Sequence, residues 1–138
     1  MKKLKNQKKD SPDIVSNFLF WRLPELIYIS KTMIAKTPSP PYYAVIFSSL
    51  RTEGDDGYSE MSEKMVALAA VQDGFLGMES ARAGLGITVS YWRDLDSIRK
   101  WRENTDHSVA RGKGRSDWYK SFKARIAKVE RDYGFEKE

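Results

Sequence analysis

Residues 75–92 read Phe-Leu-Gly-Met-Glu-Ser-Ala-Arg-Ala-Gly-Leu-Gly-Ile-Thr-Val-Ser-Tyr-Trp. Two runs with alternating apolar side chains, 75–82 and 86–92, flank the glycine-rich segment 83–86. This pattern is typical of a β-hairpin. A phosphate-binding loop is excluded, because such a loop leads into a helix and this one leads into a strand.

The segments before the hairpin predict one strand and one helix. Residues 42–51 are rich in β-branched and aromatic side chains and contain no Pro or Gly, which indicates a central strand. The carboxylates of residues 53–57 can cap the helix that follows. In residues 58–72 apolar side chains recur every three or four positions, which predicts an amphipathic helix that Gly74 ends.

The segments after the hairpin predict a second helical region and a last strand. Asp94 offers an N-cap, and the apolar face of the helix that follows includes Trp101. Residues 104–106, Asn-Thr-Asp, interrupt this helix, and the second or third of them can cap a further turn. The last strand is expected at residues 122–133.

The order strand–helix–strand–strand–helix–strand is the ferredoxin-like βαββαβ arrangement of the α+β class, with a four-stranded antiparallel sheet. Its helices cover one face of the sheet only. Alternation along the first strand puts Val45 and Phe47 opposite Ala44 and Ile46, so both faces are apolar. An uncovered apolar face usually marks an association surface, and we therefore expect a twofold homodimer through the sheet faces.

The chain has 138 residues and a formal net charge of +5, which is unevenly distributed. Residues 1–40 contain eight Lys and Arg against three Asp and Glu, whereas residues 41–138 contain sixteen of each. A neutral domain lacks the basic surface that supplies non-specific nucleic-acid affinity, so we expect no nucleic-acid partner. The absence of cysteine excludes disulfides and thiolate metal sites and fits a reducing, cytoplasmic location.

Residues 1–41 are expected to form a basic N-terminal extension separate from a domain at residues 42–138. The Pro-rich residues 37–41 are extended and stiff and mark the boundary. Charged and Pro residues at 22–25 interrupt the apolar positions of the extension, and a membrane span needs roughly 20 apolar residues. The extension is therefore either a short amphipathic segment or an upstream addition without a role, with Met33 as an alternative start.

Several phrases in residues 42–135 carry a family resemblance: Tyr43-Ala-Val-Ile-Phe47, Asp73-Gly-Phe-Leu-Gly-Met-Glu-Ser80, Val89-Ser-Tyr-Trp92, Ile98-Arg-Lys-Trp101, His107 and Val129-Glu-Arg-Asp-Tyr133. In this order they resemble the antibiotic biosynthesis monooxygenase (ABM) superfamily of dimeric α+β barrels, in its uncharacterised YqjZ-like branch. The resemblance implies a small pocket in each subunit between sheet and helices. It implies either oxidation of an aromatic polyketide without metal or flavin, or the binding and degradation of heme.

The heme-degrading members combine an Asn on the first strand, a Trp in the second helix and a His ten residues after that Trp. Trp101 matches the Trp, but Arg111 stands at the His position and the first strand offers Ser48 and Ser49. Because two of the three positions differ, heme is kept only as an alternative ligand and no cofactor is expected.

His107 is the single histidine, and with an ordinary pKa near 6.5 it can act as a base on a phenol or as an axial heme ligand. The structural alternative is a histidine that supports a helix start. Trp101 and Trp92 are either walls of a pocket that stack on a planar substrate or ordinary core residues. A single histidine and no paired-carboxylate spacing predict no metal site.

Arg111 is the first residue of a basic cluster at 111–115 and can hold a carboxylate or phenolate, unless the cluster is simply a solvated loop. Trp118 and Tyr119 either close the mouth of a pocket or pin this loop to the sheet. Ser48 is a further candidate contact to substrate.

The sequence leaves three functions open. The first is a cofactor-independent monooxygenase acting on a small aromatic substrate, with His107 as proton acceptor and Trp101 and Trp92 as stacking surfaces. The second is a non-catalytic dimeric module that binds a small hydrophobic or heme-like ligand. The third is heme handling through ligands other than those of the family.

Overall fold

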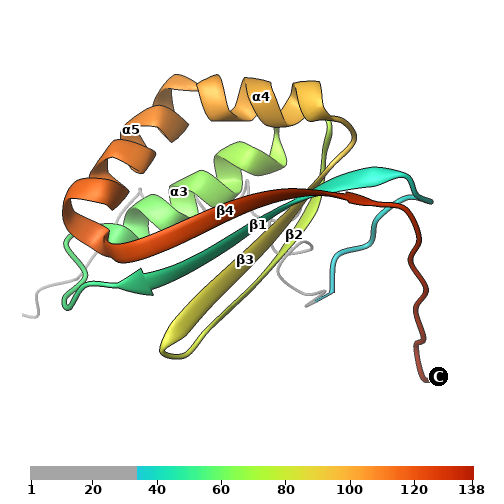
Figure 1. The fold of residues 1–138 in the computed structure, drawn as a ribbon, viewed down its shortest axis with the longest axis horizontal. Coiled ribbons are helices and arrows are strands. Elements are labelled where there is room, and N and C mark those ends of the chain that lie inside the picture. Colours follow the sequence, from blue (N-terminus) through green and yellow to red (C-terminus); the bar gives the residue numbers. More distant parts are fainter. Residues whose placement is uncertain (1–33) are drawn as a thin grey trace, which may run out of the picture.

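A four-stranded antiparallel sheet lies under three helices in the computed structural model, which describes residues 34–138 (Figure 1). The strands are β1 (Tyr42–Arg51), β2 (Phe75–Arg82), β3 (Leu85–Trp92) and β4 (Tyr119–Val129), in the order β2-β3-β1-β4. The helices are α3 (Tyr58–Ala70), α4 (Leu95–Glu103) and α5 (Thr105–Lys113), followed by a π-helical turn at Gly114–Trp118. The expected ferredoxin-like order and the central hairpin are confirmed.

The pairing of the strands shows which side chains face the helices. Tyr43 pairs with Trp92, and Trp92 packs on Trp101 of α4, so the odd-numbered residues of β1 point toward the helices. Phe47 therefore faces the helices, whereas Ile46 lies on the opposite face. Figure 1 shows all three helices on one side of the sheet, as the sequence predicts.

Four boundaries differ from the prediction. Helix α3 ends at Ala70, and Gly74 instead occupies the turn before β2 with a φ of +82°. Strand β4 begins at Tyr119, because this residue pairs with Arg51 across an irregularity in β1, and it ends at Val129, which pairs with the first residue of β1. The cap of α5 is not residue 105 or 106, since the side chain of Asn104 accepts the backbone N–H of His107 at 3.2 Å.

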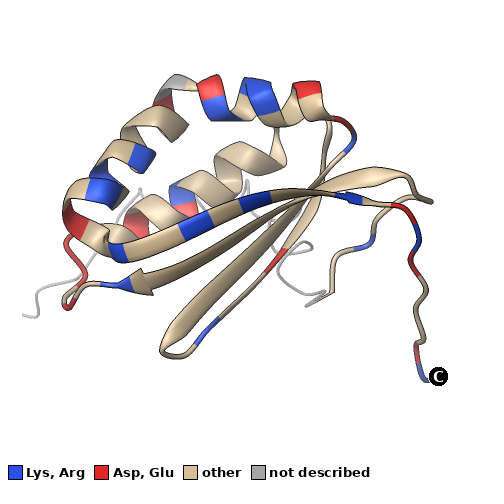
Figure 2. Cartoon of the chain, viewed as in Figure 1, with Lys and Arg blue, Asp and Glu red and all other residues tan. Residues whose placement is uncertain are grey.

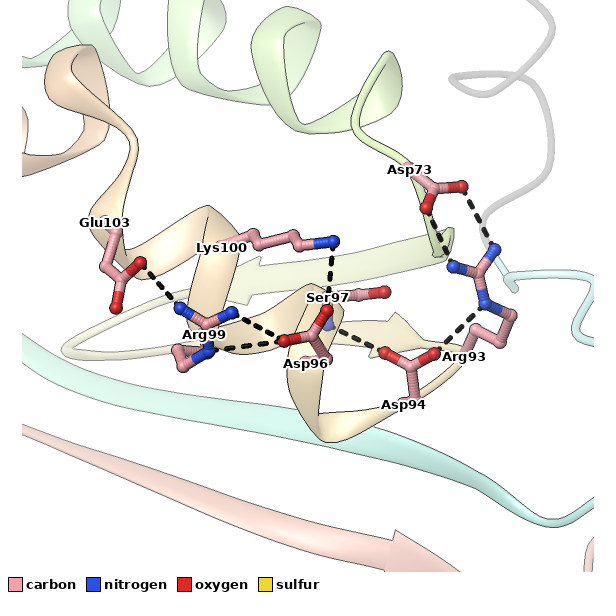
Figure 3. Close-up of polar contacts among 8 residues, drawn as sticks. All are labelled: Asp73, Arg93, Asp94, Asp96, Ser97, Arg99, Lys100 and Glu103. Carbon is pink, nitrogen blue, oxygen red and sulfur yellow. Dashed lines mark hydrogen bonds and ion pairs between the residues drawn. The ribbon is translucent and has the colours of Figure 1, made fainter.

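The turn before β2 is docked on the start of α4, as Figure 3 shows. The backbone N–H of Arg93 donates to the carbonyl of Gly74 at 2.7 Å. The Arg93 guanidinium donates to both carboxylate oxygens of Asp73, at 3.0 and 2.8 Å, and to Asp94 at 3.1 Å. Asp94 caps α4 by accepting the N–H of Ser97 at 2.7 Å, so one network fixes the helix that carries Trp101.

Residues 34–41 contact the face of the sheet that the helices leave open. The N–H of Ala35 donates to Glu79 at 3.0 Å, and the hydroxyl of Thr37 donates to the hydroxyl of Tyr42 at 3.0 Å. Tyr42 in turn donates to Asp132 at 2.7 Å. The last part of the expected extension is therefore joined to the domain, while residues 1–33 lie outside the described residues. Within the described part, no helix is long and apolar enough to cross a membrane.

The rest of the open face is apolar in the centre and basic at one edge. Leu85 is 50% exposed and Ile87 is 40% exposed. Lys123 and Arg125 lie on the same face beyond β1, on the edge strand β4, on which Figure 2 shows basic and no acidic residues. Such a surface suits the expected association through the sheet, and the homodimer stays a prediction.

Candidate functional site

A continuous aromatic stack joins the sheet to both C-terminal helices. Trp92, fully buried at the end of β3, lies with its ring centroid 6.0 Å from that of Trp101 on α4, at an interplanar angle of 27°. Trp101 stacks on His107 of α5 with centroids 4.3 Å apart and an angle of 9°. Phe75 of β2 contacts Trp92 edge-on at 5.3 Å. Three residues that the sequence singled out therefore meet on the helix-covered face.

The break between α4 and α5 positions the histidine. The carbonyl oxygen of Trp101 accepts the N–H of Asn104 at 3.2 Å, and Nδ1 of His107 lies 2.9 Å from the same oxygen. The Asn104 side chain caps the backbone of His107. The His107 ring is therefore held by the backbone of the residue on which it stacks.

This contact also fixes the tautomer of His107. A carbonyl oxygen only accepts hydrogen bonds, so Nδ1 carries the hydrogen and Nε2 keeps a free lone pair. Burial lowers the pKa of His107 below 6.5, and the charge of Arg111 adds to this lowering, while the hydrogen bond to Trp101 opposes it. At neutral pH the ring is therefore neutral and can accept a proton at Nε2.

Arg111 lies one helical turn after His107 and is half-buried. Its Nη2 donates to the hydroxyl of Ser108 at 3.4 Å, which is a long hydrogen bond. Its Nε is buried without a hydrogen-bond partner, and among the described residues it is the one buried side-chain nitrogen or oxygen in this condition. A buried donor without an acceptor is destabilising.

The other members of the basic cluster point away. Lys113 forms an ion pair with Asp117 on the surface, and Arg115 is exposed with its guanidinium 5.7 Å from the ring centre of Phe122. Of the three basic side chains between residues 111 and 115, Arg111 alone is turned inward. The expected cluster thus contributes one residue to the site.

Trp118 and Tyr119 belong to a second aromatic group at the opposite end of β1. Trp118 is buried and donates from Nε1 to the carbonyl of Asp56 at 3.0 Å. The ring of Tyr119 lies 5.4 Å from Phe47 and 6.0 Å from Tyr58, and burial raises its pKa. These contacts correspond to the structural alternative, in which the pair pins the loop to the sheet.

Ser48 lies apart from the other candidates. It pairs with Ile87 and Lys123 on the open face of the sheet, opposite to the face that carries Trp92. A surface hollow of about 400 Å³ adjoins it, and a second hollow of about 800 Å³ adjoins residues 128–133. Neither hollow adjoins His107.

Sequence reasoning missed Asn104 and Phe75 as members of the site. Asn104 precedes His107 by three residues, which is the spacing of a capping side chain and its backbone donor, and this signal was available. Phe75 follows a glycine turn and carried no signal beyond its place in a strand. In the part of the chain that the structure describes, no group of three or more His, Asp or Glu side chains could hold a metal ion.

No family model matches the chain. The uncharacterised protein YqjZ of Bacillus subtilis is 57% identical over 105 residues, which cover 75% of this chain and 92% of that protein. A jasmonate monooxygenase ABM of Pyricularia oryzae is 28% identical over 92 residues, covering 63% of this chain and 43% of that protein. The crystal structure of SnoaB, a cofactor-independent oxygenase from Streptomyces nogalater, shares the fold with a TM-score of 0.59 at 11% identity, covering 67% of this chain and 97% of SnoaB.

Proposed function

Because this chain belongs to the YqjZ branch of the antibiotic biosynthesis monooxygenase superfamily, we propose that it is a cofactor-independent monooxygenase of a small aromatic substrate. The distant relative is named a monooxygenase, and SnoaB is described as a cofactor-independent oxygenase, which supports the reaction class. The observation that carries the proposal is the neutral His107 with a free Nε2 beside a flat indole.

The chemistry needs a substrate that can reduce oxygen once it is deprotonated. An electron-rich phenol loses its hydroxyl proton to Nε2 of His107, and the resulting anion can transfer an electron to molecular oxygen. The lowered pKa keeps His107 in the proton-accepting form at neutral pH. The indole of Trp101 stacks on His107 and forms an apolar wall beside it, and the fully buried Trp92 packs against Trp101 and supports it.

Oxygen uptake with anthrone-type phenols tests this proposal. The wild-type chain should consume oxygen, and His107→Phe should lose at least about 100-fold in rate, the usual contribution of a general base. Phe keeps a ring for stacking on Trp101, so this variant separates loss of the base from loss of packing. His107→Ala removes both and should be no more active than His107→Phe.

Two outcomes would contradict the proposal. Full activity in His107→Phe would remove His107 as the base. Binding of the phenol without oxygen uptake by the wild type would favour the non-catalytic binding module. The same free Nε2 also suits an axial heme ligand, so a heme titration that gave a Soret band lost in His107→Ala would favour heme binding instead.

A further inference from the structure

We propose that the arm, defined as residues 130–138, of one copy of this chain binds the open sheet face of a second copy, at the hollow beside Ser48. The ring of Phe135 packs on the apolar side of the hollow, and the carboxylate of Glu136 pairs with its cations. The contact occurs twice in a twofold dimer. It does not rest on the proposed reaction, and it adds to the association expected through the sheet a contact made by a segment outside the sheet.

The arm displays two aromatic rings that its own chain does not cover. Tyr133 is 100% exposed and Phe135 is 88% exposed. The root of the arm is held in place, since the hydroxyl of Tyr42 donates to Asp132 at 2.7 Å. Beyond Asp132, no hydrogen bond or ion pair joins the arm to the rest of residues 34–138. Aromatic side chains are enriched in the buried centre of protein interfaces, so the arm suits a partner.

The hollow offers both apolar surface and positive charge. Its volume is about 400 Å³, and β1, β3 and β4 all contribute to its lining. Leu50 and Leu85 pair with each other across β1 and β3, and both side chains remain exposed. Lys123 and Arg125 line the hollow from β4, and neither forms an ion pair within residues 34–138. A ligand that combines an apolar group with an anion therefore fits it.

The charges of the arm and of β4 are complementary. Residues 130–138 contain four Asp and Glu against two Lys and Arg. Strand β4 contains four Lys and Arg and no acidic residue, as Figure 2 shows. Glu136 directly follows Phe135, so a carboxylate enters the hollow next to the aromatic ring. Opposite charges across an interface suppress wrong partners and fix the register of the contact.

The geometry of the sheet selects a second copy over the same chain. Figure 1 shows the arm leaving the sheet at the end where β1 begins and turning toward the open side. The hollow lies at the other end, where β1 finishes at Arg51. A twofold axis that runs across the strands, between two open faces, reverses the strands of the second copy. The hollow of that copy then lies at the end of the sheet from which the arm leaves.

Disulfide trapping tests the contact directly, because the chain contains no cysteine. One chain carries Phe135→Cys, and a second, tagged chain carries Leu85→Cys. A mild oxidant added to the equilibrated mixture should give a disulfide-linked heterodimer, since a disulfide requires Cβ atoms within about 4.5 Å of each other. Leu95→Cys is the matched control, because Leu95 is also an exposed leucine but lies at the start of α4, and it should give no such heterodimer.

Sedimentation equilibrium of the full chain measures the strength of the contact. Phe135→Ala should raise the dimer dissociation constant at least about 100-fold, because the symmetric dimer loses the burial of two aromatic side chains. The variant should stay folded, since Phe135 is exposed within its own chain, and circular dichroism checks this. Val71→Ala shortens another exposed apolar side chain, at the end of α3, and should leave the dissociation constant unchanged.

Charge reversal tests the ionic part of the contact. Lys123→Glu combined with Arg125→Glu should weaken the dimer at least about 10-fold, because like charges then meet. Adding Glu136→Lys to the same chain should restore part of the affinity, which a general loss of positive charge does not predict. Lys120→Glu lies on the same strand but does not line the hollow, so it should associate as the wild type does.

Three results would overturn the inference. The first is a mixture that forms no more heterodimer than the Leu95→Cys control, and the second is a doubly substituted chain, Leu85→Cys with Phe135→Cys, that forms only an internal disulfide. The third is Phe135→Ala that associates as tightly as the wild type, which would mean that the sheet faces meet without the arm. None of these measurements involves oxygen uptake, so the proposed reaction stands or falls separately.

Discussion

Replacing Gly74 by Ala should destabilise the domain strongly, because two costs coincide at this residue. Its φ of +82° lies in the left-handed region, which costs an L-residue about 1–2 kcal/mol. A Cβ added here would lie 2.0 Å from Oγ and 2.6 Å from Cβ of Ser97. Ser97 is buried in the first turn of α4, so the clash adds about 1–3 kcal/mol of overpacking. The free energy of unfolding should therefore fall by about 3 kcal/mol.

Urea unfolding followed by tryptophan fluorescence measures this loss. Two further variants separate the backbone cost from the cost of the clash with Ser97. Gly57 has a φ of +80° with no atom within 4 Å of an added Cβ, so Gly57→Ala isolates the backbone cost. Gly74→Ala combined with Ser97→Gly removes the nearest clash and should recover part of the difference. Equal losses in Gly74→Ala and Gly57→Ala would refute the reasoning, because they would show that Ser97 does not resist the added methyl group.

Three further predictions concern the ionisable groups around α4 and α5. The pKa of His107 is lower in the folded chain than in the unfolded chain, so the free energy of unfolding should fall as the pH drops from 6.5 toward the folded pKa. Urea unfolding at several pH values measures this fall, and His107→Phe should lack it. Arg111→Met should raise the free energy of unfolding by about 1 kcal/mol, since it removes a buried donor without an acceptor, and thermal unfolding that showed a loss would contradict this. The N–H of Ser97 lowers the pKa of Asp94 from 3.8 to about 2, so the stability that this cap supplies is lost as the pH falls between those values. The melting temperature of Asp94→Ala should lie below that of the wild type at neutral pH and should lack this acid-induced loss.

The sequence predicted the fold well because hydrophobic periodicity and glycine placement are local signals. The hairpin at residues 75–92 and the face-by-face alternation of β1 follow from patterns within a few residues. The early start of β4 did not follow, since it depends on Tyr119 pairing with Arg51, far away in the chain. Local sequence patterns therefore predict which segments form strands, whereas pairing with neighbouring strands determines where each strand begins and ends.

The site could be predicted only in part for the same reason. His107 and Trp101 were identified as single residues, and their parallel stacking depends on the break at Asn104. The separation of Ser48 from the site follows from alternation along β1, which sequence reasoning had already described without applying it to Ser48. The sequence does not predict that Arg111 is the basic residue of the cluster that turns inward, because the face of α5 on which a residue lies depends on where the helix begins.

The hydrogen bonds of residues 34–41 bear on how the chain can be shortened for laboratory work. A version that began at Tyr42 would lose the Ala35 N–H that satisfies Glu79 and the Thr37 hydroxyl that contacts Tyr42. The trimmed protein would leave Glu79 with the hydroxyl of Tyr91 as its donor and would uncover part of the face through which copies are expected to meet. Self-association measured on such a trimmed version would reflect the truncation itself, so shortened versions should begin no later than Ile34.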